Sequence, residues 1–391
     1  MGIVTSGMII LLALSGGLPE IMWQGDEGIC GSIASSGMGN TVYADVSPEA
    51  ALTNPAIASE LPEGFTFGVT GMLTLDVEKR TRRVYDSFGG VVGESEYSFN
   101  QNFQPLPGGV AVSWKSGKMA ASVGWRASST FGYNYTRVMN DDNYVKIGQE
   151  ILEVSGILND IGVSFAWAQS EIFSFGAGGS YVTGTRSLSS KINWVDPTVT
   201  DIDEEVDTDI SGLITRASVS AALDRVSLYG GIEYYSGWKT EVATVSNDVT
   251  LPLIARVGLR YQPGNRLLSL FAADFWWSGT SSVEVEDVDA GLRNSWGFGA
   301  GVENTLPGNT IARVGFEYDS SPIVAALNRM KFTTGLGWAV NELLSVDAAI
   351  SFSPVRWDQY QNDGLPSFIP GDSLVVESSR TAFSAGITQV F

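Results

Sequence analysis

Residues 65–77, FTFGVTGMLTLDV, alternate strictly between two kinds of side chain. One face is apolar or small: Phe65, Phe67, Val69, Gly71, Leu73, Leu75 and Val77. The other face is mostly polar: Thr66, Gly68, Thr70, Met72, Thr74 and Asp76. A period of two residues predicts a β-strand, because successive side chains of a strand point to opposite faces.

The same period recurs along the chain, for example at 253–261 and 344–352. Tight turns separate pairs of such stretches: Ser116-Gly117-Lys118, Ser170-Glu171, Asp224-Arg225, Pro263-Gly264-Asn265, Pro307-Gly308-Asn309 and Asn341-Glu342. Longer polar segments, which we expect to be loops, lie between the pairs: 79–106, 136–150, 190–209, 281–291 and 357–373. The pattern gives about fourteen strands with short turns at one end and long loops at the other, which is typical of outer-membrane barrels. The predicted fold class is all-β: a transmembrane antiparallel β-barrel.

A soluble β-sandwich or propeller would also show many alternating strands. Three features favour the transmembrane barrel. The strands exceed the usual length of about five or six residues, and one face is polar enough to line a water-filled lumen. Aromatic side chains also lie near the strand ends, where a membrane girdle would place them: Trp276, Trp277, Trp338 and Tyr318.

Composition excludes several functions for this chain of 391 residues. Its formal net charge of −20 argues against nucleic acid as a partner, because phosphate binding needs clustered Lys and Arg. It has no histidine, which removes imidazole bases and the commonest zinc ligand. We therefore expect neither an enzyme nor a metal or cofactor site. The single cysteine, Cys30, cannot form an intrachain disulfide.

The two ends of the chain resemble export signals. The apolar run MIILLAL, residues 8–14, is shorter than the roughly 18 residues of a membrane-spanning helix, and small residues follow it. Residues 1–25 are therefore predicted to be a signal peptide or its remnant. The final stretch TAFSAGITQVF ends in Phe391 and resembles the C-terminal strand signal of outer-membrane barrels. It implies the barrel-assembly machinery as a partner and the outer membrane of a diderm bacterium as the location.

Residues 35–61 are rich in small residues and turn formers, and they precede the first clear strand. A barrel of this size has a lumen too wide for its own side chains to fill, so residues 26–62 are predicted to form a plug, or hatch, inside the barrel of residues 63–391. Gly37 and Gly39 would let the hatch fold tightly, and Asn54-Pro55 would supply a turn.

The segment ASSGMGNTVYADVSPEAALTNPAIAS, with its triplet Asn54-Pro55-Ala56, resembles the hatch of the FadL family of outer-membrane transport proteins. Three later segments resemble that family's late strands in the expected order: LPLIARVGLRYQP, TIARVGFEYDSSPI and NRMKFTTGLGWAV. The resemblance implies a fourteen-stranded barrel with an N-terminal hatch. It also implies passive uptake of long-chain fatty acids or other hydrophobic compounds.

In that family the ligand leaves sideways, through a gap made by a kink in the third strand. The matching strand is MAASVGWRASSTFGYNY, and its Phe131-Gly132 resembles the kink. We expect Gly132 to permit the bend and the hydroxyls of residues 128–130 to satisfy the freed backbone groups. Arg256 and Arg260 on the eighth strand are candidates for binding a carboxylate head group; the alternative is that they pair with lumen carboxylates.

The expected partners are a hydrophobic small molecule and outer-membrane lipid. Two other functions stay open. A general porin would pass small solutes without selectivity, although a plugged lumen is a poor pore. A non-transporting barrel that serves as a scaffold or takes part in secretion would have the same front end.

Overall fold

The computed structural model describes residues 26–27, 31–88, 90–140, 145–242, 245–250, 253–263, 269–279, 282–285, 288–289, 293–322, 325–359 and 374–391. The predicted signal peptide and Cys30 lie outside these residues.

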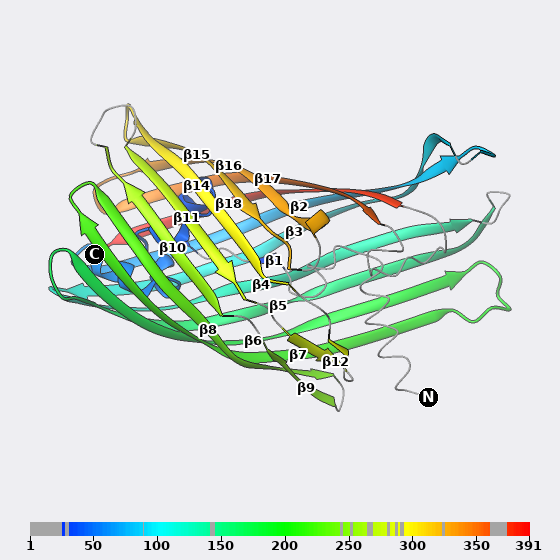
Figure 1. The fold of residues 1–391 in the computed structure, drawn as a ribbon, viewed down its shortest axis with the longest axis horizontal. Coiled ribbons are helices and arrows are strands. Elements are labelled where there is room, and N and C mark those ends of the chain that lie inside the picture. Colours follow the sequence, from blue (N-terminus) through cyan, green and yellow to red (C-terminus); the bar gives the residue numbers. More distant parts are fainter. Residues whose placement is uncertain are drawn as a thin grey trace.

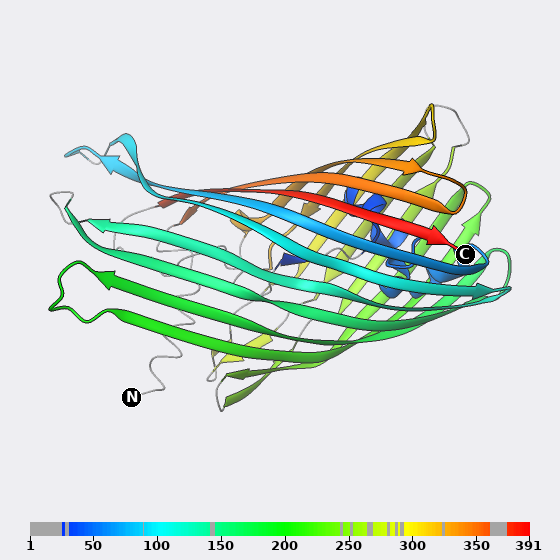
Figure 2. The ribbon, with the colours of Figure 1, turned by 180° about the vertical axis from the view of Figure 1, so that it is seen from behind.

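Fourteen strands of the described chain close into one antiparallel ring, which confirms the predicted fold class (Figures 1 and 2). They are β2 (Gly64–Tyr85), β3 (Val91–Ser116), β4 (Met119–Asn140), β5 (Lys146–Ala168), β6 (Phe173–Trp194), β7 (Ile202–Leu223), β8 (Val226–Val242), β10 (Ile254–Tyr261), β11 (Leu270–Ser278), β14 (Ser295–Leu306), β15 (Thr310–Asp319), β16 (Arg329–Ala339), β17 (Leu344–Gln359) and β18 (Leu374–Val390). The ring closes where β18 pairs with β2, from Val390↔Thr66 to Leu374↔Arg82.

Four short strands lie outside the ring sequence. They are β1 (Asp26–Glu27), β9 (Val245–Thr250), β12 (Ser282–Val285) and β13 (Val288–Asp289). Strand β9 pairs with β8 and β12, and β12 pairs with β13, so these three extend the wall. Strand β1 pairs with β4 instead.

The alternating side chains of the first strand divide as predicted. Phe65 and Leu73 are 52% and 41% exposed, whereas Thr66 and Thr74 are only 2% and 1% exposed. The apolar face is therefore the outside of the barrel. Every ring strand after β2 also has a large exposed apolar side chain: Trp114, Val123, Phe165, Phe175, Val219, Ile232, Val257, Phe275, Phe298, Val314, Leu336, Ile350 and Phe383. Such an outer band suits contact with lipid.

The short turns gather at the end of the barrel that contains the C-terminus, here called the turn end (Figures 1 and 2). The strands meet there through 117–118, 169–172, 224–225, 307–309 and 340–343, close to the predicted positions. Most of the predicted turn at 263–265 and most of the predicted loop at 357–373 lie outside the described residues.

The long loops predicted for the opposite, extended end are wrong in the first half of the chain. Most of 79–106, 136–150 and 190–209 is strand, and the true connections there are 86–90, 141–145 and 195–201. Strand β3 has 26 residues, whereas about 9–11 cross a membrane. Strands β2 to β7 extend well beyond strands β10 to β16 (Figure 1). Polar side chains on the outer face of the extended part hide the alternation.

The hatch, residues 31–61, lies within the barrel near the turn end and is blue in Figures 1 and 2. It contains α3 (Ile33–Gly37) and three short 3-10 helices, η1 (Val42–Ala44), η2 (Ala50–Leu52) and η3 (Pro55–Glu60). The Ser32 hydroxyl caps α3 by accepting a hydrogen bond from the amide of Ser35. No helix in the described part of the chain is long and apolar enough to cross a membrane.

Candidate functional site

The predicted hatch glycines lie against the strands β14 to β16. A Cβ on Gly37 would come within 3.1 Å of the Cα of Gly335, and one on Gly39 would collide with the carbonyl of Phe316. Gly39 also has φ +75°, a conformation that favours glycine. The Thr333 hydroxyl accepts from the Gly39 amide at 2.9 Å and donates to the Gly37 carbonyl at 3.0 Å. Backbone contact of this kind requires glycine at position 39 and leaves little room for a side chain at position 37.

The triplet Asn54-Pro55-Ala56 fixes the other end of the hatch. The Asn54 side chain donates to the Tyr43 carbonyl at 3.0 Å, which ties η3 to η1. Pro55 occupies the first position of η3, where its missing amide costs nothing. The Ala56 amide donates to the Ser218 hydroxyl of β7 at 2.8 Å. The triplet therefore joins the hatch both to itself and to the wall.

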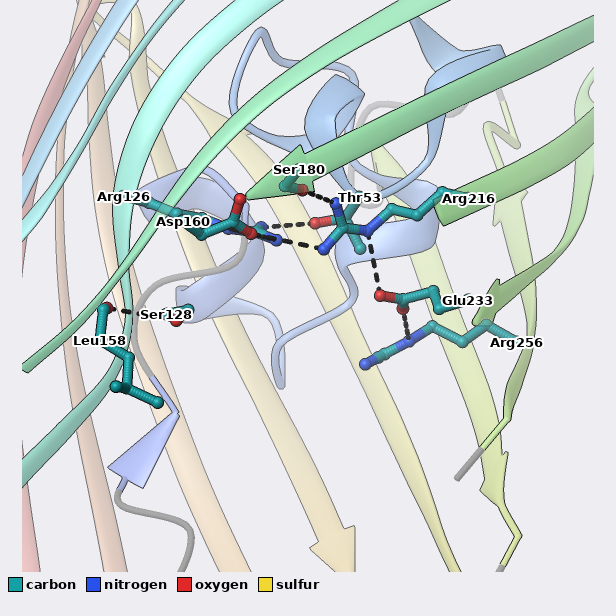
Figure 3. A network of polar contacts seen from close by, with 9 residues as sticks. All are labelled: Thr53, Arg126, Ser128, Leu158, Asp160, Ser180, Arg216, Glu233 and Arg256. Carbon is teal, nitrogen blue, oxygen red and sulfur yellow. Dashed lines mark hydrogen bonds and ion pairs between the residues drawn. The ribbon is translucent and has the colours of Figure 1, made fainter. Parts of the chain in front are cut away.

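Beside the hatch, five charged side chains of the inner wall alternate in sign and form the lumen charge chain (Figure 3). The order is Arg126, Asp160, Arg216, Glu233 and Arg256, with nitrogen–oxygen distances of 2.9, 3.4, 3.1 and 2.8 Å. Arg126 also donates to the Thr53 hydroxyl of the hatch at 2.6 Å. The lumen charge chain links β4, β5, β7, β8 and β10 to the hatch, which makes this level of the lumen polar.

Replacing Asp160 by alanine should destabilise the barrel by about 3–5 kcal/mol, because the change leaves two buried guanidinium groups without their shared acceptor. Urea unfolding in detergent, followed by loss of β-sheet circular dichroism, measures this loss. The matched control is Asp203→Ala, which removes an exposed pair with Lys191 (3.3 Å) and should cost at most about 1 kcal/mol. Equal midpoints for the two variants would show that the lumen charge chain does not hold the wall.

The predicted head-group residues, Arg256 and Arg260, both have carboxylate neighbours. Arg256 pairs with Glu233 and stacks over the Trp276 ring at 5.7 Å. Arg260 lies 3.9 Å from a carboxylate oxygen of Glu60 in the hatch. These contacts fit the alternative that lumen arginines pair with lumen carboxylates, and binding of a ligand head group stays a prediction.

Glu49 is a buried acid of the hatch that the sequence did not single out. Its carboxylate lies against Gly68 of β2, where a Cβ would collide with it. Burial, together with the nearby negative charge of Asp45, raises the pKa of Glu49 to about 8. The docked hatch therefore holds this carboxyl in its neutral form at neutral pH.

The raised pKa makes the hatch sensitive to pH. The folded protein keeps a proton on Glu49 that the unfolded chain releases near pH 4.5, so stability should fall as pH rises from about 4.5 to about 8. Glu49→Gln keeps the shape without the charge. Its urea midpoint, relative to the parent, should therefore increase between pH 5 and pH 9. A constant difference over this range would show that Glu49 does not titrate in the folded state.

Towards the extended end, the inner wall becomes apolar. Buried side chains from β4 to β7, from β17 and β18 and from the short helix η4 (Ala325–Leu327) pack together there. This apolar lumen cluster consists of Phe131, Tyr133, Tyr135, Leu152, Val154, Leu158, Val182, Leu188, Ile210, Ile214, Leu327, Val355 and Val376. These packed side chains make this part of the inner wall apolar.

The wall beside this cluster is interrupted between β3 and β4. Their ladder runs from Ser116↔Met119 to Gly109↔Arg126, and no described residue of either strand continues it. The register of β4 against β5 shifts between Ala127 and Ser129. From there the hairpin β2–β3 diverges from β4–β5 (Figure 2). The bend thus begins before the predicted Phe131-Gly132, which lie on the free edge of β4.

The structure favours glycine at position 132 for a different reason from the one expected. Its φ lies outside the left-handed region, so the bend does not require glycine there. Instead the side-chain amide of Gln104 on β3 occupies the place that a Cβ would need. Phe131, the other predicted residue, points into the apolar lumen cluster. Whether a ligand uses this gap stays a prediction.

The freed backbone groups of β4 find partners that the sequence did not reveal. Asn102 donates to the Gly132 carbonyl at 3.3 Å, and Asn100 accepts from the Thr136 amide at 2.8 Å. Strand β1 pairs with Ser129 and Thr130. The expected serine hydroxyl serves another bond, because Ser128 donates to the Leu158 carbonyl on β5 (Figure 3).

Taken together, the described residues form a fourteen-stranded barrel with a polar, plugged level, an apolar level and a wall gap beside it. Solved structures share this fold over nearly the whole chain. The toluene transporter TodX of Pseudomonas putida aligns with a TM-score of 0.60 and 16% identity, over 94% of this chain and 99% of TodX.

Two other solved structures align similarly. A FadL homologue of Pseudomonas aeruginosa gives a TM-score of 0.58 and 15% identity, over 92% of this chain and 98% of the homologue. The toluene transporter TbuX of Ralstonia pickettii gives 0.57 and 17%, over 93% and 99%. No protein-family model and no curated protein matches the sequence. The fold that the sequence resemblance implied is thus confirmed.

Proposed function

We propose that this protein is a passive channel for hydrophobic small molecules in the outer membrane of a diderm bacterium. The observation that carries the proposal is the adjacency of the apolar lumen cluster and the wall gap, because Phe131 belongs to one and lies on the edge of the other. A long-chain fatty acid or an aromatic hydrocarbon is the proposed ligand.

The proposed route follows from the free energy of transferring the ligand to water or to lipid. Release into water would expose its apolar surface at a cost of about 25 cal/mol per Å², whereas passage through the wall keeps that surface in lipid. The hatch and the lumen charge chain obstruct the turn end with polar groups. The proposed path therefore runs from the extended end into the apolar lumen cluster and out between β3 and β4.

Ligand binding by the purified protein tests the proposal. We expect toluene and oleate to bind, and Phe131→Ala to weaken that binding about tenfold, a change of about 1.4 kcal/mol that loss of a buried ring can supply. The matched control is Phe165→Ala, which removes an exposed, lipid-facing ring and should leave affinity unchanged. Native mass spectrometry and titration in detergent provide the measurements. Equal affinities for the two variants would place the site elsewhere.

A general porin remains the rival function, and the hatch disfavours it. A scaffold or secretion-associated barrel would bind neither ligand, so the same titration separates it from the channel.

A further inference from the structure

Strand β4 departs inward from the wall, and its side chains reach β2 across β3. Tyr133 of β4 bonds to side chains of Glu78 and Arg80 on β2. In the wall β3 lies between these strands, with Asn100 opposite Glu78 and Ser98 opposite Arg80. The Tyr133 side chain therefore crosses the inner face of β3. On the same face of β3, the side chains of Asn100 and Asn102 bond to the backbone of β4, which places β4 inside the line of the wall.

Four side chains form this contact, here called the β2–β4 clasp: Glu78, Arg80, Tyr133 and Tyr135. Arg80 donates to Glu78 at 2.7 Å and to the Tyr133 hydroxyl at 2.8 Å. That hydroxyl donates to Glu78 at 3.1 Å. The Arg80 guanidinium also lies 4.2 Å from the centre of the Tyr135 ring. Among the described residues, the partners that Glu78 and Arg80 have outside their ion pair thus come from β4.

The clasp is buried, with Arg80 only 3% and Glu78 only 6% exposed. A buried ion pair is a weak source of stability, because desolvation of both charges offsets their attraction. Hydrogen bonds and a ring face that satisfy the remaining groups make burial tolerable. Because Tyr133 and Tyr135 supply them, moving β4 back to the wall would leave the pair incompletely satisfied.

Strand β1 pairs with β4 only at Ser129 and Thr130. Beyond that contact, β3 and β4 would be expected to pair if nothing held them apart, since unsatisfied backbone groups are costly in an apolar surrounding. The side chains of Asn100 and Asn102 on β3 form hydrogen bonds with two backbone groups of β4, the Thr136 amide and the Gly132 carbonyl. They bridge the strands but keep them farther apart than a ladder would. Pro105 and Pro107 lack amide donors on the same stretch of β3, which weakens a ladder further.

We propose that the β2–β4 clasp is a positioning device that holds β4 inward and so keeps the wall gap open. Its importance for transport rests on the proposed function, in which the gap is the exit. The geometry itself does not depend on a ligand.

Spin-label distances test the clasp. Labels are placed at Phe103 of β3 and Asn134 of β4, both exposed, in a Cys30→Ser background. In Tyr133→Phe, which removes one hydroxyl, we expect the population at the spacing of paired strands, about 5 Å between backbones, to rise about tenfold. The matched control is Tyr229→Phe, which removes a similar bond to Glu60 (3.0 Å) far from the gap and should keep the parent distances.

A second variant tests the clasp even if the remaining contacts compensate for the lost Tyr133 hydroxyl. Glu78→Gln combined with Arg80→Met removes both charges together and should shift the distances in the same direction. Parent distances in both clasp variants, with heat-modifiable barrels on gels, would overturn the proposal. Uptake of toluene is measured in parallel. Closed strands with undiminished uptake would support the clasp and reject the exit route, so the two proposals fail separately.

Discussion

A barrel that lacks residues 31–60 should conduct ions at least about tenfold better than the parent in planar bilayers, because these residues fill a lumen that wall side chains cannot close. The ring does not depend on them, since β2 begins at Gly64 and pairs with β18 and β3. The deletion removes Thr53 from Arg126 but leaves the ion pairs of the lumen charge chain in the wall.

Single-channel recording measures the effect, and heat-modifiability on gels verifies the ring. Ser36→Ala serves as the control, because it alters one partly buried hydroxyl and leaves the hatch in place. Conductance and current noise equal to those of the parent would show that the segment does not obstruct the pore.

Gly132→Val should lower uptake of a hydrophobic compound about tenfold in cells that lack their own transporter, because the valine side chain and the Gln104 amide compete for the same space in the gap. Gly132→Ala should have a smaller effect, since the flexible Gln104 amide can turn away from one methyl group. Adding Gln104→Ala to Gly132→Val should restore part of the uptake.

Ala121→Val is the matched control. It lies on the same strand, where β4 pairs with Trp114 of β3, and should leave uptake at the parent level. Parent-level uptake by a folded Gly132→Val barrel would mean that ligands leave by another route.

Much of the wall could be predicted because the strands face lipid on one side and the lumen on the other, which imposes a two-residue period on their sequence. That period is clear in 65–77 and again in Val257 and Leu259, and the tight turns divide the strands. The signal weakens where strands leave the apolar band. In β7, Asp203 and Glu205 face outward while Val206 and Ile210 face inward, so an acidic stretch predicted as loop is an alternating strand.

The hatch could be recognised from Gly37, Gly39 and the triplet at 54–56, whose backbone contacts restrict the residue types. The clasp could not, because Arg80 fell in a predicted loop and its partner Tyr133 is two strands away. The lumen charge chain was equally hidden. Pairing Arg126 with Asp160 requires the register of two strands, which local alternation does not supply.

Uptake of labelled toluene and oleate by cells that express the parent protein, compared with cells carrying an empty vector, tests the proposed channel most directly. Uptake of a radiolabelled sugar, small enough to pass through a general porin, is measured in the same cells. We predict faster uptake of at least one hydrophobic compound and no gain in sugar entry. Free entry of sugar with no gain for either hydrophobic compound would contradict the account and identify the protein as a general porin.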